Sequence, residues 1–182
     1  MFVLASASPR RSMLLRSAGY EFEIMPSDAE EKKDESLSPC ELAVSLAESK
    51  CENVYLRSGG KICLGADTIV VFEGKILGKP ADKSINAQYL KKLSGNVHSV
   101  ITGYCIIKDG KKYSGYDQSF VKFNELSDEL ISSYVESGNG LDKAGGYGIQ
   151  DGFDLVEKIS GSYSCVVGLP MEKITPLLEE LL

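Results

Sequence analysis

The chain has 182 residues, of which 43% are hydrophobic and 25% are charged, and its formal net charge at pH 7 is −6. A chain of this size and composition can bury a core, and we expect one globular domain over residues 1–182. The negative charge argues against a protein that coats nucleic acid or an anionic membrane. No apolar stretch approaches the roughly 18 residues of a membrane span. We therefore expect a cytoplasmic protein with neither a nucleic acid polymer nor a membrane as partner.

The five cysteines and the single histidine bear on redox state and metal binding. The cysteines form an odd set without a C-x-x-C pair, which argues against a zinc site. Their mostly aliphatic neighbours favour small buried side chains in a reducing compartment. A catalytic cysteine is the alternative, with His98 as the one imidazole base that the chain offers.

The N-terminal segment predicts an anion site. Residues 2–5 form an apolar strand, and the chain continues through Ser6-Ala7-Ser8-Pro9-Arg10-Arg11 into a helix over 11–18. Ser8 can cap this helix and Pro9 suits its first turn. The helix start carries partial positive charge, and each arginine offers a planar fork that suits phosphate oxygens. On this segment alone, two solvated surface charges remain an equal alternative.

The next elements lead to a polar interruption within an apolar stretch. A short strand over 21–25 and a charged loop over 27–36 precede Ser38-Pro39-Cys40-Glu41, a capping box that opens a helix to about residue 55. Residues 61–72 are rich in β-forming side chains. Gly65-Ala66-Asp67-Thr68 interrupts them, and we expect a bulge or a tight bend there.

The second half of the chain predicts a long antiparallel hairpin. Asp109-Gly110 is a strong hairpin signal between strands over 97–108 and 112–123. The other expected elements are a strand over 75–77, a loop over 78–80, helices over 85–93, 127–137 and 170–182, a glycine-rich segment over 138–152 and a strand over 155–159. Helices between strands, together with one antiparallel hairpin, indicate an α/β fold with a mixed sheet.

Asp67 is the catalytic candidate from the residues themselves. Aspartate is disfavoured within a strand, so a carboxylate between apolar runs is held either for structure or for chemistry, and the residues alone weigh these equally. For Lys79, in Gly78-Lys79-Pro80, a surface charge is the plainer interpretation, and Lys50 can equally be a favourable charge near a helix end. If these groups meet, the lysines would bind phosphate and the carboxylates would hold a divalent cation.

The glycine-rich run from Asp142 to Gln150 offers a loop of exposed N–H groups and an amide that both donates and accepts. An exposed Asp142–Lys143 ion pair in a flexible loop is the plainer interpretation. The chain has no Walker A loop, no G-x-G-x-x-G and no nucleophile elbow. Any nucleotide site must therefore be built differently.

Several blocks, in order along the chain, resemble the Maf-like nucleoside triphosphate pyrophosphatases, formerly described as septum-formation inhibitors. The blocks are Leu4-Ala5-Ser6-Ala7-Ser8-Pro9-Arg10-Arg11, Gly65-Ala66-Asp67-Thr68-Ile69-Val70-Val71, Gly78-Lys79-Pro80, Ser94-Gly95-Asn96-Val97-His98, Thr102-Gly103, Asp142-Lys143-Ala144-Gly145-Gly146-Tyr147-Gly148-Ile149-Gln150, Gly161-Ser162-Tyr163 and Val166-Val167-Gly168-Leu169-Pro170. Together they are far more specific than any one of them.

The resemblance implies an elongated α/β protein with two lobes around a central cleft, similar to the inosine triphosphate pyrophosphatases, and a homodimer. It implies hydrolysis of a nucleoside triphosphate to the monophosphate and pyrophosphate with a divalent cation, Mg²⁺ or Mn²⁺. It assigns Asp67 as proton acceptor and links Arg10, Thr68 and Gln150 to substrate choice. The combination is similar to the branch that acts on dTTP and UTP rather than on 7-methyl-GTP.

We therefore expect Arg10, Arg11, Lys50 and Lys79 to bind phosphate together with Ser8, and Asp67 with Glu31 to hold the cation or to orient water. Two residues depart from the family pattern: Asp151 replaces a usual glycine, and Cys165 a usual asparagine. Modified pyrimidine nucleotides are an alternative substrate class. A nucleotide-binding regulator of cell division that does not cleave is the alternative outside the enzymes.

Overall fold

The structure is a computed structural model that describes residues 1–31 and 34–182. Residues 32–33, within the loop expected over 27–36, lie outside the described residues. In the described part of the chain, seven strands form one mixed sheet in the order β2-β1-β3-β5-β6-β7, with β4 paired to β3. The strands are β1 (Phe2–Leu4), β2 (Phe22–Ile24), β3 (Cys63–Phe72), β4 (Lys75–Leu77), β5 (Val97–Lys108), β6 (Lys111–Phe123) and β7 (Val156–Ser160).

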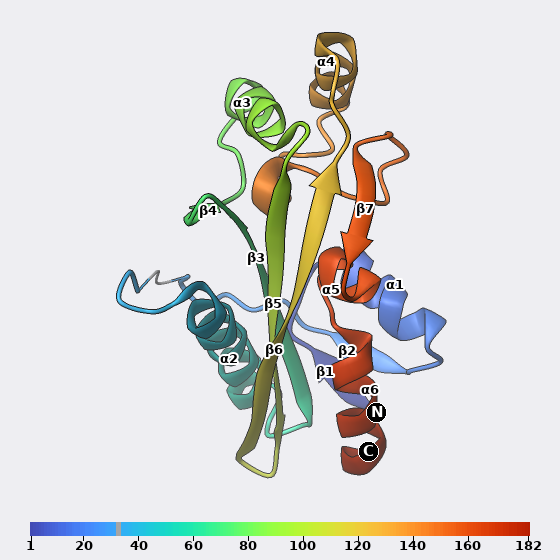
Figure 1. The fold of residues 1–182 in the computed structure, drawn as a ribbon. Helices are drawn as coiled ribbons and strands as arrows, with labels where there is room; N and C mark the ends of the chain where they lie inside the picture. Colours follow the sequence, from blue (N-terminus) through green and yellow to red (C-terminus); the bar gives the residue numbers. More distant parts are fainter. Residues whose placement is uncertain (32–33) are drawn as a thin grey trace.

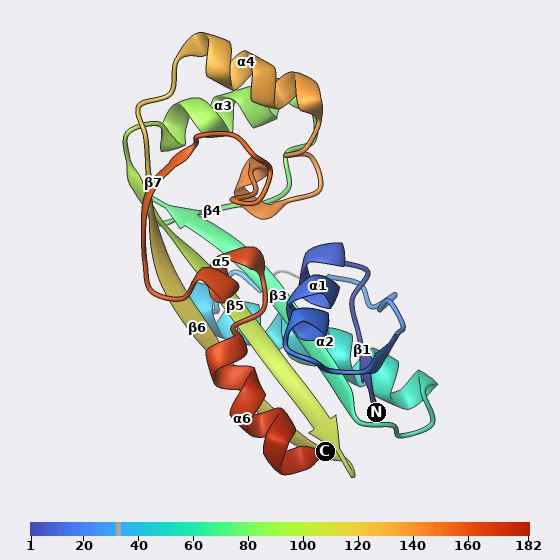
Figure 2. The ribbon, with the colours of Figure 1, turned by 90° about the vertical axis from the view of Figure 1, so that its right-hand side faces the viewer.

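The expected mixed sheet is confirmed, and helices flank it. They are α1 (Pro9–Ser17), α2 (Pro39–Arg57), α3 (Lys83–Leu93), α4 (Asp128–Ser137), the 3-10 turn η1 (Ala144–Gly146), α5 (Tyr163–Val167) and α6 (Met171–Leu181). Figure 1 shows α2 on one face of the sheet and α1, α5 and α6 on the other. Figure 2, turned by 90°, shows α3 and α4 together at one end of an elongated molecule.

Two large apolar clusters stabilise the two ends. One cluster packs α3 and α4 against the sheet and includes Leu90, Phe123 and Tyr134, all fully buried. The other packs α6 against β1, β3 and β5 and includes Phe2 and Ile174. Because β3, β5 and β6 run through both ends of the molecule, each of these strands contributes side chains to both clusters.

Strand β3 corrects one expectation, because it contains neither a bulge nor a bend. Cys63 through Val71 pair with β5 in an unbroken antiparallel register. Gly65 is present for another reason: a Cβ there would lie 2.6 Å from the carbonyl oxygen of Ala47 in α2, and a Cβ at Gly103 would lie 2.2 Å from that of Ala43. The two glycines let α2 lie directly on the sheet.

The helix boundaries follow the sequence signals closely. Ser8 caps α1, Ser38 and Glu41 form the capping box of α2, and Ser127 caps α4. All five cysteines are free thiols, and every one except Cys40 is buried. None of the helices in the described residues is both long and apolar enough to cross a membrane.

Candidate active site

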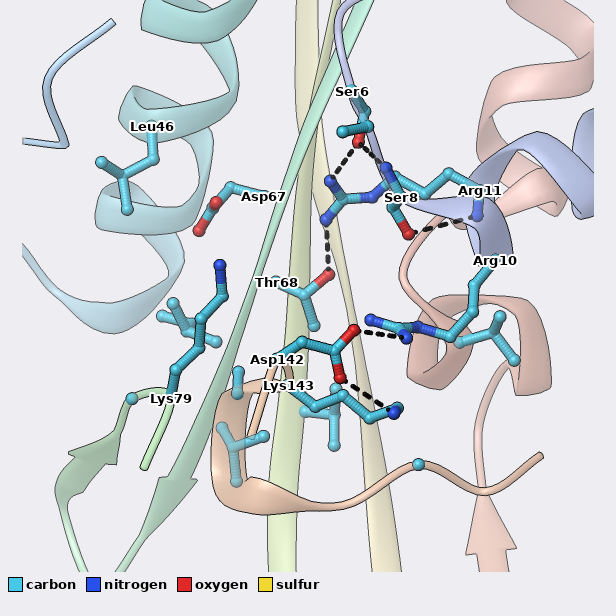
Figure 3. A pocket seen from close by; sticks show the side chains of 18 of the residues that line it. Ser6, Ser8, Arg10, Arg11, Leu46, Asp67, Thr68, Lys79, Asp142 and Lys143 are labelled. Carbon is cyan, nitrogen blue, oxygen red and sulfur yellow. Dashed lines mark hydrogen bonds and ion pairs between the residues drawn. The ribbon is translucent and has the colours of Figure 1, made fainter. Parts of the chain in front are cut away.

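The predicted site residues share one cleft of about 660 Å³. Figure 3 shows part of its lining, with side chains that come from β3, from α1 and from the loops after β4 and α4. All nine residues singled out from the sequence line it: Ser8, Arg10, Arg11, Glu31, Lys50, Asp67, Thr68, Lys79 and Gln150.

Arg11 is held from three sides in the first turn of α1. Its Nε donates to the carbonyl oxygen of Gly168 at 2.7 Å, and its terminal nitrogens donate to the hydroxyls of Ser6 at 3.1 Å and Thr68 at 3.2 Å. Burial lowers its pKa, while the nearby Asp67 opposes that shift. The guanidinium remains the charged form at neutral pH because arginine titrates so far above it.

Ser8 has a structural role beside its place in the cleft. Its side chain accepts a hydrogen bond from the backbone N–H of Arg11, and Pro9 occupies the first helical position. This is the cap that the sequence predicts. The cap fixes the turn from which both arginines project.

The two predicted metal-binding carboxylates meet at one ammonium group. Lys50 Nζ lies 2.5 Å from Asp67 Oδ1 and 2.6 Å from Glu31 Oε1. The Lys50 and Asp67 side chains are 17% and 13% exposed, so this pair is largely shielded from water. Lys50 comes from α2, Asp67 from the middle of β3 and Glu31 from the loop before α2. The close packing of α2 on the sheet brings the first two together.

Asp67 and Thr68 point in different directions because neighbouring residues of a strand alternate between faces. Asp67 meets Lys50 of α2, whereas Thr68 meets Arg11 of α1. Figure 3 shows Lys79 extending from the loop after β4 towards Asp67. The cleft therefore has cations on both sides of β3.

The loop after α4 forms the opposite wall. Arg10 pairs with Asp142 at 3.3 Å, and Asp142 pairs with Lys143 at 3.0 Å. Partial burial opposes ionisation of Asp142, but the hydrogen bonds and charges of Lys143 and Arg10 hold its pKa below the usual value. Gln150 lines the cleft from the same loop. The predicted Asp142–Lys143 ion pair is thus present, but the Lys143 side chain is only 10% exposed, and Arg10 adds a third charge.

The departure at Asp151 has a structural role in this loop. Its carboxylate accepts a hydrogen bond from Tyr134 at 2.5 Å and lies 3.5 Å from Lys143 Nζ. The Tyr134 oxygen in turn accepts from the N–H of Gly148 at 3.0 Å. Cys165, the other departure, is a buried thiol whose backbone carbonyl accepts from Thr102. Asp151 therefore ties the Gln150 loop to α4.

Sequence reasoning missed several partners of the site. The hydroxyl of Ser6 and the carbonyl of Gly168 accept hydrogen bonds from Arg11, and the hydroxyl of Thr102 is hydrogen-bonded to that of Thr68. Ser6 and Gly168 stand within the motifs that carry the resemblance, but a motif does not say which backbone atom accepts a bond. The other missed feature is α5, whose five residues are too few to show a helical period.

The donor set near Asp67 fits a hard divalent cation that also takes ligands from a substrate. The available groups are carboxylate oxygens, the ligands that Mg²⁺ and Mn²⁺ favour. No group of three or more His, Cys, Asp or Glu side chains among residues 1–31 and 34–182 could hold a metal ion. If such a cation binds here, Asp67 and Glu31 would supply two ligands and phosphate oxygens the others.

Comparison with known proteins gives the same family that the motifs indicate. The family model described as Maf-like protein matches residues 1–181. A protein of Thermococcus gammatolerans named dTTP/UTP pyrophosphatase is 51% identical over 180 residues, covering 98% of this chain and 96% of its own. Proteins of the same name from Thermococcus onnurineus and Aquifex aeolicus are 48% and 43% identical, with 98% of this chain covered in each case and 97% and 94% of theirs. This chain belongs to the Maf-like protein family.

Proposed function

We propose that this protein hydrolyses dTTP and UTP between the α and β phosphates, which releases the nucleoside monophosphate and pyrophosphate. The observation that carries the proposal is the gathering of four predicted phosphate ligands and two carboxylates on one cleft. The relatives named dTTP/UTP pyrophosphatase support it, because they match this chain over nearly its full length.

In this proposal Arg11, Lys50 and Lys79 bind phosphate oxygens, and Ser8 contributes its hydroxyl at the helix start. A triphosphate carries several negative charges, and the protein itself has a net charge of −6. Local cations must therefore outweigh the repulsion of the whole molecule. The Arg11 fork suits two phosphate oxygens at once, whereas each lysine acts as a point charge.

We assign the attacking water to Asp67. Water attacks the α phosphorus, the bond from that phosphorus to the α–β bridging oxygen breaks, and pyrophosphate leaves. Asp67 either accepts the proton from the water or orients it. Lys50 neutralises Asp67, and an incoming triphosphate offers this ammonium other oxygen partners. One oxygen of Asp67 then becomes available to the water.

We also propose that Glu31 and Asp67 hold a divalent cation, Mg²⁺ or Mn²⁺, together with the substrate phosphates. When bound, such a cation lowers the pKa of a water ligand and neutralises charge on the leaving pyrophosphate. Lys50 already lies within 2.6 Å of both carboxylates, so the same two oxygens can serve one positive charge or another.

Substrate choice is assigned to Arg10, Thr68 and Gln150, all of which line the cleft. Modified pyrimidine nucleotides are included in the proposed substrate range, which would make the enzyme one that cleans the nucleotide pool. A rate comparison among dTTP, UTP, CTP, 5-methyl-UTP and methylated GTP tests this range. We expect dTTP and UTP, with or without small pyrimidine modifications, to be hydrolysed faster than CTP and methylated GTP.

The proposal places the enzyme in the cytoplasm as a homodimer of single-domain chains spanning residues 1–182. Tyr116 and Phe120 offer a surface for association, because strand alternation puts both on the same face of β6 and each is 48% exposed. Light scattering coupled to size-exclusion chromatography measures the mass in solution. A monomer at micromolar concentration would contradict this part of the proposal.

The decisive experiment separates pyrophosphate from orthophosphate among the products of dTTP. We expect dTMP and pyrophosphate from the natural chain, and a loss of about 10²- to 10⁴-fold in kcat for Asp67→Asn, the range for removing a general acid–base group. Asp128→Asn is the matched control, because Asp128 is exposed on α4 and outside the cleft. Release of dTDP and orthophosphate, or tight binding of dTTP without turnover, would overturn the proposal. The second result would favour a regulator.

A further inference from the structure

A short chain of hydroxyl groups connects Arg11 to the backbone of α5. The Thr68 oxygen accepts from Arg11 at 3.2 Å and lies 2.9 Å from the hydroxyl of Thr102. Thr102 donates to the carbonyl oxygen of Cys165 at 2.8 Å. Thr102 is fully buried and lies on β5 directly opposite Thr68 of β3. The sequence motifs contain Arg11, Thr68 and Thr102 without indicating this connection, and Cys165 lies outside them.

The direction of each hydrogen bond in this chain is fixed. A carbonyl oxygen can only accept, so the single proton of Thr102 goes to Cys165. The bond between the two threonines must then be donated by Thr68. With its only proton used, the Thr68 oxygen can only accept, and Arg11 is the donor that meets it. Thr68 has no proton left for a phosphate oxygen.

The consequence for Arg11 follows from counting its donors. A guanidinium carries five N–H groups. Described residues engage three of them, through Gly168, Ser6 and Thr68. One N–H remains on each terminal nitrogen, which is the arrangement that binds two oxygens of a phosphate. The orientation of this fork depends on its three acceptors. Thr102 fixes one of them, the Thr68 hydroxyl on β3.

We propose that Thr102 is a positioning residue for substrate binding: it directs the Thr68 hydroxyl so that Thr68 holds the Arg11 guanidinium towards the phosphates. This inference rests on the proposed function for its effect on catalysis. Its structural part concerns Arg11 alone. The lack of a side chain at Gly168 leaves room for this contact, since a Cβ there would lie 3.2 Å from Thr68 Oγ1 and 3.6 Å from Arg11 Nε.

Thr102→Val and Thr102→Ser test the inference. The valine has the shape of threonine without the hydroxyl, and we expect it to raise KM for dTTP about five- to tenfold with kcat within about twofold. This is the range for losing one hydrogen bond in a binding contact made equally in the ground and transition states. The serine keeps the donor and should restore KM to within about twofold of the natural value. In Thr68→Val the chain is already cut, so adding Thr102→Val should raise KM no further.

Ser119→Ala is the matched control for a general loosening of α5. Ser119 is a fully buried hydroxyl on β6 that accepts from the N–H of Ser162 and donates to its carbonyl, at the start of the same helix. It has no contact with Arg11 or Thr68 among its hydrogen bonds. We expect Ser119→Ala to lower the melting temperature as Thr102→Val does and to leave KM unchanged.

A second measurement does not depend on enzymatic activity. The Arg11 Nε–H donates to Gly168, and its exchange with water can be followed by nuclear magnetic resonance. We expect about tenfold faster exchange in Thr102→Val, and natural exchange in Thr102→Ser and Ser119→Ala. Unchanged exchange in Thr102→Val, or equal KM effects in Thr102→Val and Ser119→Ala, would overturn the inference. If the natural chain released no pyrophosphate, the proposed function would fail, and the exchange rate would still decide the role of Thr102.

Discussion

Lys50 contacts both candidate metal-binding carboxylates, and this single ammonium therefore offsets part of their negative charge. Lys50 and its two partners come from three separate parts of the chain, so its position depends on the packing of α2 rather than on a local motif. Removing it would leave Asp67 largely buried without its nearest cation and would remove a proposed phosphate ligand.

We expect Lys50→Met to lower kcat/KM for dTTP about 10²-fold or more, as found when one preorganised electrostatic contact is removed from a reacting phosphate or oxyanion. The control is Lys112→Met. Lys112 also bridges two carboxylates of α2, Glu48 at 3.5 Å and Glu52 at 2.5 Å, but it lies outside the cleft. Steady-state kinetics on both variants compare the two sites. Equal losses would show that ion pairs of α2 matter only for stability.

His98 is buried, and its Nε2 is hydrogen-bonded to the Tyr147 hydroxyl at 2.6 Å. Among the described residues its Nδ1 has no hydrogen-bond partner. Burial lowers the pKa of His98 to about 4. Between pH 6.5 and 4 the unfolded chain therefore binds a proton at this residue that the folded chain does not.

Stability should consequently fall as the pH drops from 6.5 towards 4, and His98 should account for roughly 3 kcal/mol of that loss. Well above pH 6.5 the residue is neutral in both the folded and the unfolded chain and contributes no slope. Urea unfolding of the natural chain and of His98→Gln at pH 7 and pH 4.5 measures the effect. We expect a smaller difference between the two pH values in the variant. Identical pH dependence would contradict a neutral buried histidine.

At the scale of elements, the contact between α2 and the sheet controls the geometry of the Lys50–Asp67 pair. Gly65 lies two residues before Asp67, and its missing side chain leaves room for Ala47 and Cys51 of α2. Lys50 lies between these two helical residues in the sequence. A change in the height of α2 above β3 therefore changes the distance between the ammonium and the carboxylate.

We expect Gly65→Ala to destabilise the fold by about 1–3 kcal/mol, the usual cost of overpacking, and also to lower activity. Its Cβ would lie 2.6 Å from the Ala47 carbonyl oxygen and 2.8 Å from Cys51 Cβ. Gly74→Ala is the control, because that turn glycine has open space around it but a positive φ of 74°, so substitution strains the backbone without moving α2. Melting temperature and kcat/KM together separate stability from geometry. Full activity in Gly65→Ala would disprove the link.

The sequence predicted most elements because their signals are local. Capping residues marked the starts of α1, α2 and α4, and Asp109-Gly110 marked the turn between β5 and β6. The interruption in β3 was misinterpreted, since glycine in a strand indicates either a bulge or a close approach and only the position of α2 decides between them. The pairs Lys50–Asp67 and Arg11–Gly168 could not be predicted, because they depend on packing between distant segments.

At the scale of the whole molecule, the two ends of the fold contribute different parts of the cleft. The end that contains α3 and α4 supplies the loop with Asp142 and Gln150, and the other end supplies Arg11 and Lys50. Within the described residues, the carboxylates that face the cleft near Asp67 are too few to hold a metal ion by themselves. Metal binding should therefore depend on the nucleotide.

Equilibrium dialysis with Mn²⁺ tests this dependence. We expect little retention of Mn²⁺ by the protein alone, and about one ion per chain when a dUTP analogue with a nitrogen in place of the α–β bridging oxygen is present, because its phosphates complete the ligand set. Removal of divalent ions with EDTA should abolish hydrolysis, and added Mg²⁺ should restore it. Tight Mn²⁺ binding without the analogue would contradict a site completed by substrate.

The bond from Arg11 to the Gly168 carbonyl joins the first helix of the chain to the last part of it. During synthesis the arginine leaves the ribosome 157 residues ahead of its acceptor. A nascent or prematurely terminated chain that lacks α5 therefore has the arginine but not the clamp that orients it. The cleft reaches its binding geometry only after Gly168 has been made, so products truncated before that residue should not compete for nucleotides in the cell.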